Sequence, residues 1–126
     1  MIHEKLTAKI LEACFEVSNE LGSGFLESVY EKALLIALRQ RGLTCENQVP
    51  LRVLFRGAPV GEFFADIVVE NKVIIELKAL KCLTEEHQAQ TINYLNATGI
   101  AVGLLVNFGP RKIEYKRLYS RDAYAG

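Results

Sequence analysis

The chain has 126 residues, of which 50% are hydrophobic and 24% are charged, a balance typical of a folded globular protein. Its 15 basic and 15 acidic residues cancel, and zero net charge argues against a protein that grips nucleic acid over a long track. No hydrophobic run approaches the roughly 20 residues of a membrane span, and residues 1–5 lack the hydrophobic region of a signal peptide. We therefore expect one cytoplasmic domain over residues 1–126, without membrane association.

The N-terminal part is predicted to form a hairpin of two helices. Over residues 4–21 the hydrophobic side chains recur at the spacing of one helix face. These positions are Leu6, Ile10, Cys14, Val17 and Leu21. A second helical pattern covers about 25–41 and stops at Gly42. Because only a short glycine-containing link joins the two patterns, the helices should pack against each other.

Beyond Gly42 the hydrophobic period changes from about four residues to two, which predicts strands. The alternation over residues 49–55 indicates a strand with one buried face, followed by a turn at 57–59. Residues 61–69 and 73–79 are two further strands rich in Val and Ile, with Glu70-Asn71-Lys72 between them.

The C-terminal part predicts one more helix and two more strands. Residues 85–98 form the helix, which Gly99 ends, and residues 100–107 form a strand buried on both faces. A turn at Gly109-Pro110 leads into a last strand over residues 112–119. The order ααβββαββ predicts an α/β fold of the α+β kind, with a mixed central sheet flanked by helices.

Charge is unevenly distributed along the chain. Residues 12–31 hold Glu12, Glu16, Glu20, Glu27 and Glu31 and no Lys or Arg. Residues 110–121 are basic and contain two tyrosines. A basic strand with aromatic residues can follow a phosphate backbone. The alternative is a solvated edge strand that Lys and Arg protect from pairing.

Three charged residues interrupt the hydrophobic strands: Asp66 in the second, and Glu76 and Lys78 in the third. A buried, unpaired ion loses several kcal/mol of hydration, so something must compensate these charges. If Glu70-Asn71-Lys72 is a three-residue hairpin loop, Asp66 lies opposite Glu76, and Lys78 shares the face of Glu76. Opposed carboxylates repel unless a proton or a cation lies between them, and oxygen ligands suit Mg²⁺ or Mn²⁺. The alternative is an ion pair of Lys78 with one of the carboxylates.

A separate segment, Gly24-Phe25-Leu26-Glu27-Ser28-Val29-Tyr30, has the form GxxExxY. Alone, Glu27 is explained by the dipole of the helix that it begins, and Tyr30 by the core. Together with residues 61–66, 75–79 and 87–95, however, the segment resembles the GxxExxY family of the PD-(D/E)XK nuclease superfamily. Within residues 87–95, Gln90 and Tyr94 are similar to the QxxxY element of RecB-like nucleases.

The resemblance implies a restriction-endonuclease-like fold with a bound Mg²⁺ or Mn²⁺. Asp66, Glu76 and the backbone carbonyl of Leu77 would hold the metal, with Glu27 as a further ligand, directly or through water. Lys78 would orient or help deprotonate the attacking water and stabilise charge on the phosphate. The family's acidic motif opens here with Ala65 in place of proline.

The same resemblance places Gln90 and Tyr94 against nucleic acid, because residues one helical turn apart can face one cleft. The alternative explanation of these two residues is a polar helix face that contains one amphipathic tyrosine.

Two functions follow from these readings. The first is metal-dependent hydrolysis of phosphodiester bonds in DNA or RNA, with nucleotides as a weaker candidate substrate. Retention of Glu27, Asp66, Glu76 and Lys78 favours it. The second is a non-catalytic, nuclease-like binding module that acts with a protein partner or as a homodimer. Zero net charge and the absence of an attached DNA-reading segment favour that alternative.

Overall fold

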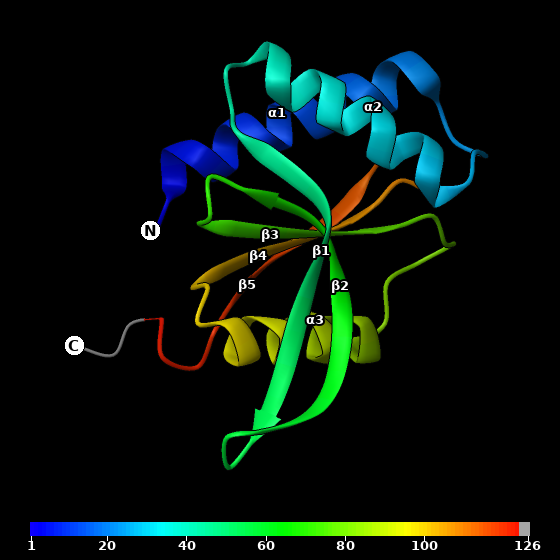
Figure 1. Cartoon of the computed structure of the whole chain (residues 1–126). Helices are drawn as coiled ribbons and strands as arrows, with labels where there is room; N and C mark the ends of the chain where they lie inside the picture. The colour runs from blue at the N-terminus through cyan, green and yellow to red at the C-terminus, as the bar shows by residue number, and fades with distance from the viewer. Residues whose placement is uncertain (124–126) are drawn as a thin grey trace.

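A five-stranded sheet forms the centre of the computed structural model, which describes residues 1–123 (Figure 1). The elements are α1 (Glu4–Leu21), α2 (Glu27–Gln40), β1 (Cys45–Phe55), β2 (Ala58–Val69), β3 (Val73–Lys78), α3 (Glu85–Thr98), β4 (Val102–Asn107) and β5 (Glu114–Tyr119). The strands are arranged in the order β1-β2-β3-β4-β5, and only β3 and β4 are parallel. The predicted order ααβββαββ and the mixed sheet are therefore confirmed.

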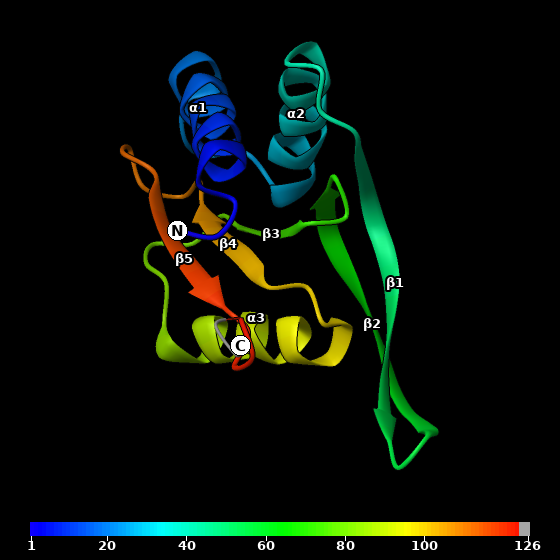
Figure 2. The ribbon, with the colours of Figure 1, turned by 90° about the vertical axis from the view of Figure 1, so that its left-hand side faces the viewer.

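Helices cover both faces of the sheet, with α1 and α2 on one face and α3 on the other (Figure 2). The larger hydrophobic cluster joins the helical hairpin to residues such as Ile67, Ile75 and Leu104. A smaller one lies under α3 and includes Ile74 and Leu105. Successive strand residues point to opposite faces, which explains why neighbours such as Ile74 and Ile75 belong to different clusters. None of the helices within residues 1–123 is long and apolar enough to cross a bilayer.

The β2–β3 hairpin has the predicted register, with Val69 opposite Val73. Glu70 and Asn71 in its loop both adopt left-handed backbone angles. The ladder is short, however, and ends at the pair Ile67 and Ile75. Before Ile67, β2 therefore pairs with β1 alone.

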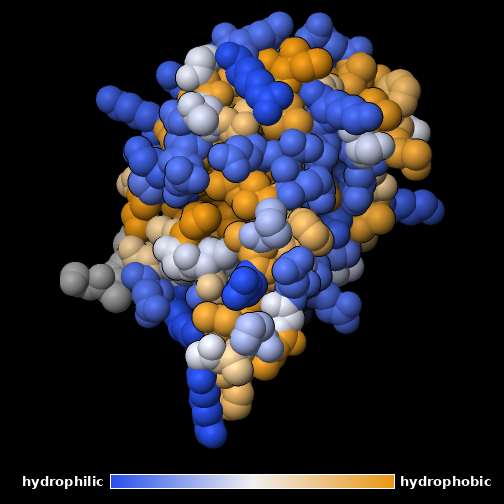
Figure 3. Space-filling model, viewed as in Figure 1, coloured by the Kyte–Doolittle hydropathy of each residue, from blue (hydrophilic) through white to orange (hydrophobic). Residues whose placement is uncertain are grey.

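As a result, residues 49–64 extend beyond the rest of the sheet as a two-stranded ribbon, which we call the arm (Figures 1 and 2). Its turn consists of Arg56 and Gly57, both with positive φ, as a type I′ hairpin turn requires. The turn predicted at 57–59 is therefore displaced, because Ala58 and Pro59 belong to β2. Hydrophobic and hydrophilic residues are interspersed over the arm, at the bottom of Figure 3.

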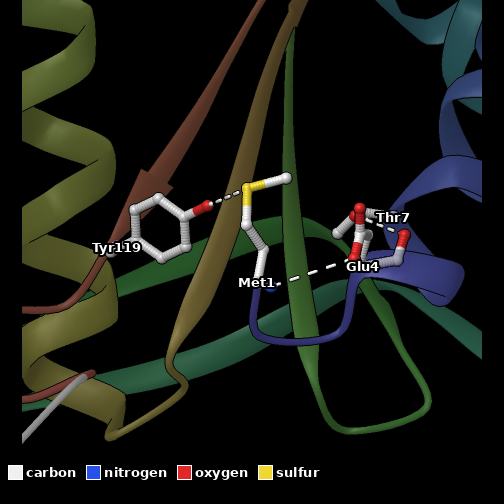
Figure 4. Close-up of polar contacts among 4 residues, drawn as sticks. All are labelled: Met1, Glu4, Thr7 and Tyr119. Carbon is white, nitrogen blue, oxygen red and sulfur yellow. Dashed lines mark hydrogen bonds and ion pairs between the residues drawn. The ribbon is translucent and has the colours of Figure 1, made fainter.

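The beginning of α1 is fastened to the end of β5 (Figure 4). The hydroxyl of Tyr119 donates to the sulfur of Met1 at 3.5 Å, and the Met1 amino group lies 3.8 Å from the Glu4 carboxylate. Thr7, which is fully buried, donates to the carbonyl of Glu4 at 3.0 Å. These contacts hold the first turn of α1 close to the last strand.

Candidate active site

Asp66 and Glu76 meet at the point where β2 and β3 separate. The Asp66 N–H donates to Glu76 Oε1 at 3.3 Å, and the Leu77 N–H donates to Asp66 Oδ2 at 2.8 Å. The backbone pairing of β2 with β3 ends at Ile67 and Ile75, so the next N–H groups are accepted by side-chain carboxylates in place of backbone carbonyls. The structure brings the two predicted acidic residues together on adjacent antiparallel strands.

Glu76 is the more deeply buried of the two, with 7% of its surface exposed. Burial is the main reason why the pKa of Glu76 is raised to about 8, and the charge of Asp66 adds to the rise. Lys78 acts in the opposite direction without cancelling these effects. Near neutral pH Glu76 therefore holds its proton.

Lys78 is half-buried at the end of β3. Within residues 1–123 it forms no ion pair with Asp66 or Glu76, so the ion-pair alternative is not the arrangement found. Its backbone carbonyl accepts the Phe108 N–H at 2.8 Å, which ties this end of β3 to the residue after β4. The ammonium group thus acts on Glu76 electrostatically without forming an ion pair with either carboxylate.

Glu27 begins α2 and approaches the acidic pair from the helical hairpin. It lines a pocket of about 180 Å³ together with Ser28, Glu31, Gln48, Asp66 and Leu77. The structure therefore brings Glu27 and Asp66 to one pocket, although they are far apart in the sequence. Glu76 and Lys78 do not line this pocket.

Three of the lining residues, Ser28, Glu31 and Gln48, are not among the predicted site residues. The Gln48 amide nitrogen donates to Glu31 Oε1 at 2.7 Å and to Asp66 Oδ1 at 3.2 Å, so it connects α2 to the site. The backbone of Gln48 has a φ of 49°, a left-handed conformation that is costly for a residue with a side chain. Glu31 could have been found, because it lies one helical turn after Glu27 on the same face.

Tyr30, the last residue of the GxxExxY motif, has a structural role. It is 1% exposed, and its ring stacks on Phe108 with centroids 4.7 Å apart. Its hydroxyl donates to the Gly22 carbonyl at 2.7 Å and accepts the Phe25 N–H at 3.2 Å. Tyr30 therefore fixes the loop that leads into α2, and with it the position of Glu27.

We expect Tyr30→Phe to lower the free energy of unfolding by about 1–3 kcal/mol, because two backbone groups lose their partner. Urea unfolding followed by circular dichroism measures this difference. Tyr115→Phe is the matched control, since Tyr115 is 41% exposed and should change stability by less than about 0.5 kcal/mol. Equal stability of Tyr30→Phe and the wild type would show that the hydroxyl does not hold the loop.

On the other side of the site, α3 contributes Tyr94. Its ring stacks on Phe63 of the arm, with centroids 3.6 Å apart. Burial raises the pKa of Tyr94, and the charges of Glu76 and Asp66 raise it further, which places Tyr94 within electrostatic reach of both. Gln90 is exposed one turn earlier, and no contact within residues 1–123 connects its side chain to the acidic pair.

The segment after Lys78 is held by Asn107, which is completely buried at the end of β4. Its side-chain oxygen accepts the N–H groups of Leu80 at 2.9 Å and Gly109 at 3.1 Å. Its amide nitrogen donates to the Leu80 carbonyl at 3.0 Å and to Glu114 at 3.1 Å. This clamp fixes the backbone directly after the candidate site.

The chemistry of the donor set fits a hydrated magnesium or manganese ion. Both ions prefer carboxylate, carbonyl and water oxygens, and Mg²⁺ commonly binds through one or two carboxylates and keeps several waters. Asp66 and Glu76 supply two carboxylates. Within residues 1–123, no three His, Cys, Asp or Glu side chains are grouped closely enough to form a metal-binding cluster. Glu27 is thus not grouped with the pair as a third ligand.

Comparisons with known proteins bear on the family and the fold of the chain. The family model for the PD-(D/E)XK nuclease superfamily matches residues 4–118. The crystal structure of the protein SSO0001 is similar in fold, with a TM-score of 0.58 and 20% sequence identity. The match covers 94% of this chain and 59% of that chain, so this chain spans less than two thirds of the length of SSO0001. No curated protein matches significantly.

Proposed function

Because the chain belongs to the PD-(D/E)XK nuclease superfamily, we propose that it is a metal-dependent nuclease of the GxxExxY family that hydrolyses phosphodiester bonds in DNA or RNA. The observation that carries the proposal is the Asp66–Glu76 pair, which lies where two strands separate and includes a buried carboxyl group. Opposed carboxylates repel each other unless a proton or a cation lies between them, and Mg²⁺ and Mn²⁺ are cations that prefer such oxygen ligands.

Asp66, Glu76 and the Leu77 carbonyl would hold Mg²⁺ or Mn²⁺, with Glu27 joined through water. A metal held there would supply Lewis acidity toward the phosphate and would lower the pKa of a bound water. Among the chain's own residues, Lys78 stabilises the charge that develops on the phosphate oxygens and orients the attacking water. Gln48 orients Asp66, since one of its amide hydrogens is directed at that carboxylate.

Nucleic acid would reach the site along α3. Tyr94 lies within reach of the acidic pair, and Gln90 lies one turn before it on the exposed side of the helix. An aromatic ring and an amide are suited to bases, which stack on rings and form hydrogen bonds at their edges. We assign both residues to nucleic-acid binding.

The test is cleavage of labelled single- and double-stranded DNA and RNA with Mg²⁺, Mn²⁺ or EDTA. We expect metal-dependent cleavage that Lys78→Ala reduces by about 100-fold or more. Lys72→Ala is the matched control, because Lys72 is an exposed lysine in the β2–β3 loop. Cleavage that persists in EDTA, or at the wild-type rate in Lys78→Ala, would exclude the proposed site.

A second candidate function is a nuclease-like module that binds nucleic acid without cleaving it, together with a protein partner or a second copy. The lack of a three-ligand metal cluster within residues 1–123 and the zero net charge favour it. Oligonucleotide binding without cleavage under every metal condition would select this alternative.

A further inference from the structure

A second and larger cleft lies between the arm and α3, with a volume of about 550 Å³. Val53 and Leu54 of the arm form one wall, and Asn93, Tyr94 and Asn96 of α3 form the other. Arg121, which follows β5, completes the lining with Ala97. The two walls come from elements that are distant in the sequence and cross in Figure 1.

The lining combines three kinds of groups. The arm provides hydrophobic side chains, the helix provides amides, and Arg121 provides the only charge among the lining residues. The Asn96 side-chain oxygen accepts the backbone N–H of Arg121 at 2.9 Å, so the Asn96 NH₂ group remains available as a donor. A hydrophobic wall, amide groups and a cation match the flat face, the hydrogen-bonding edge and the phosphate of a nucleotide.

Tyr94 connects this cleft to the candidate active site. It lines the cleft, stacks on Phe63 at the base of the arm, and is influenced by the charges of Glu76 and Asp66. A strand whose phosphate lies at the acidic pair would therefore pass Tyr94 before entering the cleft. Arg121 lines the same cleft.

We propose that the cleft binds nucleotides of a single-stranded stretch of nucleic acid adjacent to the cleaved bond. This inference rests on the proposed nuclease function. The volume is in the range of sites for small ligands, on the order of 300–1,000 Å³, which accommodates a nucleotide and not a duplex. Free base edges and faces are offered by unpaired nucleotides, whereas a duplex keeps its bases stacked.

Ala97 allows a sharp test, because it is exposed on α3 and lines the cleft. Glutamate and lysine have nearly equal helix propensities, so Ala97→Glu and Ala97→Lys differ mainly in the charge placed in the cleft. Fluorescence anisotropy would measure binding of a labelled single-stranded oligonucleotide, and of its duplex, to the full chain in EDTA.

We expect Ala97→Glu to weaken single-strand binding about tenfold and Ala97→Lys to preserve or strengthen it. Arg121→Gln should weaken binding and reduce the salt dependence by about one phosphate contact. Ala8→Glu, an exposed alanine of α1, is the control for a general charge effect. Thermal melts of each variant verify that the fold is intact.

Equal affinities of Ala97→Glu and Ala97→Lys would overturn the inference, as would wild-type preference for the duplex or a lack of oligonucleotide binding. The two proposals fail separately. If Ala97→Glu changes neither cleavage nor binding, the proposal for the cleft is wrong and the proposed nuclease function stands. If binding depends on the charge at position 97 but no metal condition gives cleavage, the proposed nuclease function is wrong and the proposal for the cleft stands.

Discussion

Gly109→Ala is expected to lower the free energy of unfolding by about 2 kcal/mol or more, and the melting temperature by roughly 8 °C. A Cβ atom at this position would overlap the Leu80 carbonyl oxygen and lie 2.6 Å from the Leu80 nitrogen. These are backbone atoms, held by Asn107 from both sides, so they cannot turn away as a flexible side chain does. Differential scanning calorimetry measures the change.

Gly61→Ala is the matched control. Gly61 has no positive φ, and its nearest neighbour to an added Cβ is Val53 at 4.0 Å. An alanine there should leave stability unchanged or raise it by about 0.4–1 kcal/mol, because the unfolded chain loses freedom. If Gly109→Ala and Gly61→Ala have the same melting temperature, the backbone at Leu80 is not held in place by Asn107.

The second large effect is a loss of stability with rising pH in metal-free protein. The pKa of Glu76 is raised from 4.5 to about 8 in the folded state. Between these values the folded state holds a proton that the unfolded state releases, so the free energy of unfolding falls as pH rises. The stabilisation is complete below about pH 4.5 and is lost above about pH 8, with a size on the order of a few kcal/mol.

Glu76→Gln should remove this part of the pH dependence. The amide keeps an oxygen for the Asp66 N–H and cannot ionise, so we expect similar stability to the wild type near pH 5 and greater stability near pH 8.5. Chemical unfolding in EDTA across this range measures both profiles. Parallel profiles for the two proteins would show that Glu76 is not the titrating group.

Bound metal should restore the stability that the wild type loses as pH rises, and it should have much less effect on Glu76→Gln. At pH 8, Mn²⁺ at a hundredfold excess over its dissociation constant is expected to stabilise the folded state by about 2.7 kcal/mol. Glu76→Gln should lack most of this increase, because a neutral amide is a weaker ligand. Equal stabilisation of both proteins by Mn²⁺ would place the ion elsewhere.

The sequence was most informative where the interactions are local. The helix boundaries follow from hydrophobic spacing, and α1 matches the predicted residues 4–21. The facing of Asp66 and Glu76 follows from a three-residue loop, because Val69 opposite Val73 determines the register of the pairs beyond. The hydrophobic pattern of the two strands could not show that the pairing of β2 with β3 ends one residue pair before Asp66 and Glu76.

Gln48 could not be placed in the same way. The β1–β2 register shifts between Val53 and Leu54, so counting back from the hairpin turn gives the wrong partner for Asp66. The left-handed backbone of Gln48 and its contact with Glu31 depend on where α2 packs, which no local pattern records. The cleft between the arm and α3 was hidden for the same reason, since its walls meet only in the folded chain.

The strand order has a consequence for self-association. β1 and β5 are the outermost strands of the sheet, and unpaired strand edges are templates on which other chains aggregate. The outer edge of β1 is irregular: Gln48 is left-handed, Pro50 lacks an N–H group, and the register shifts after Val53. β5 carries Lys116 and Arg117, whose charges disfavour stacking of like strands. The distortion that directs Gln48 toward Asp66 therefore also makes β1 a poor template for amyloid-like growth.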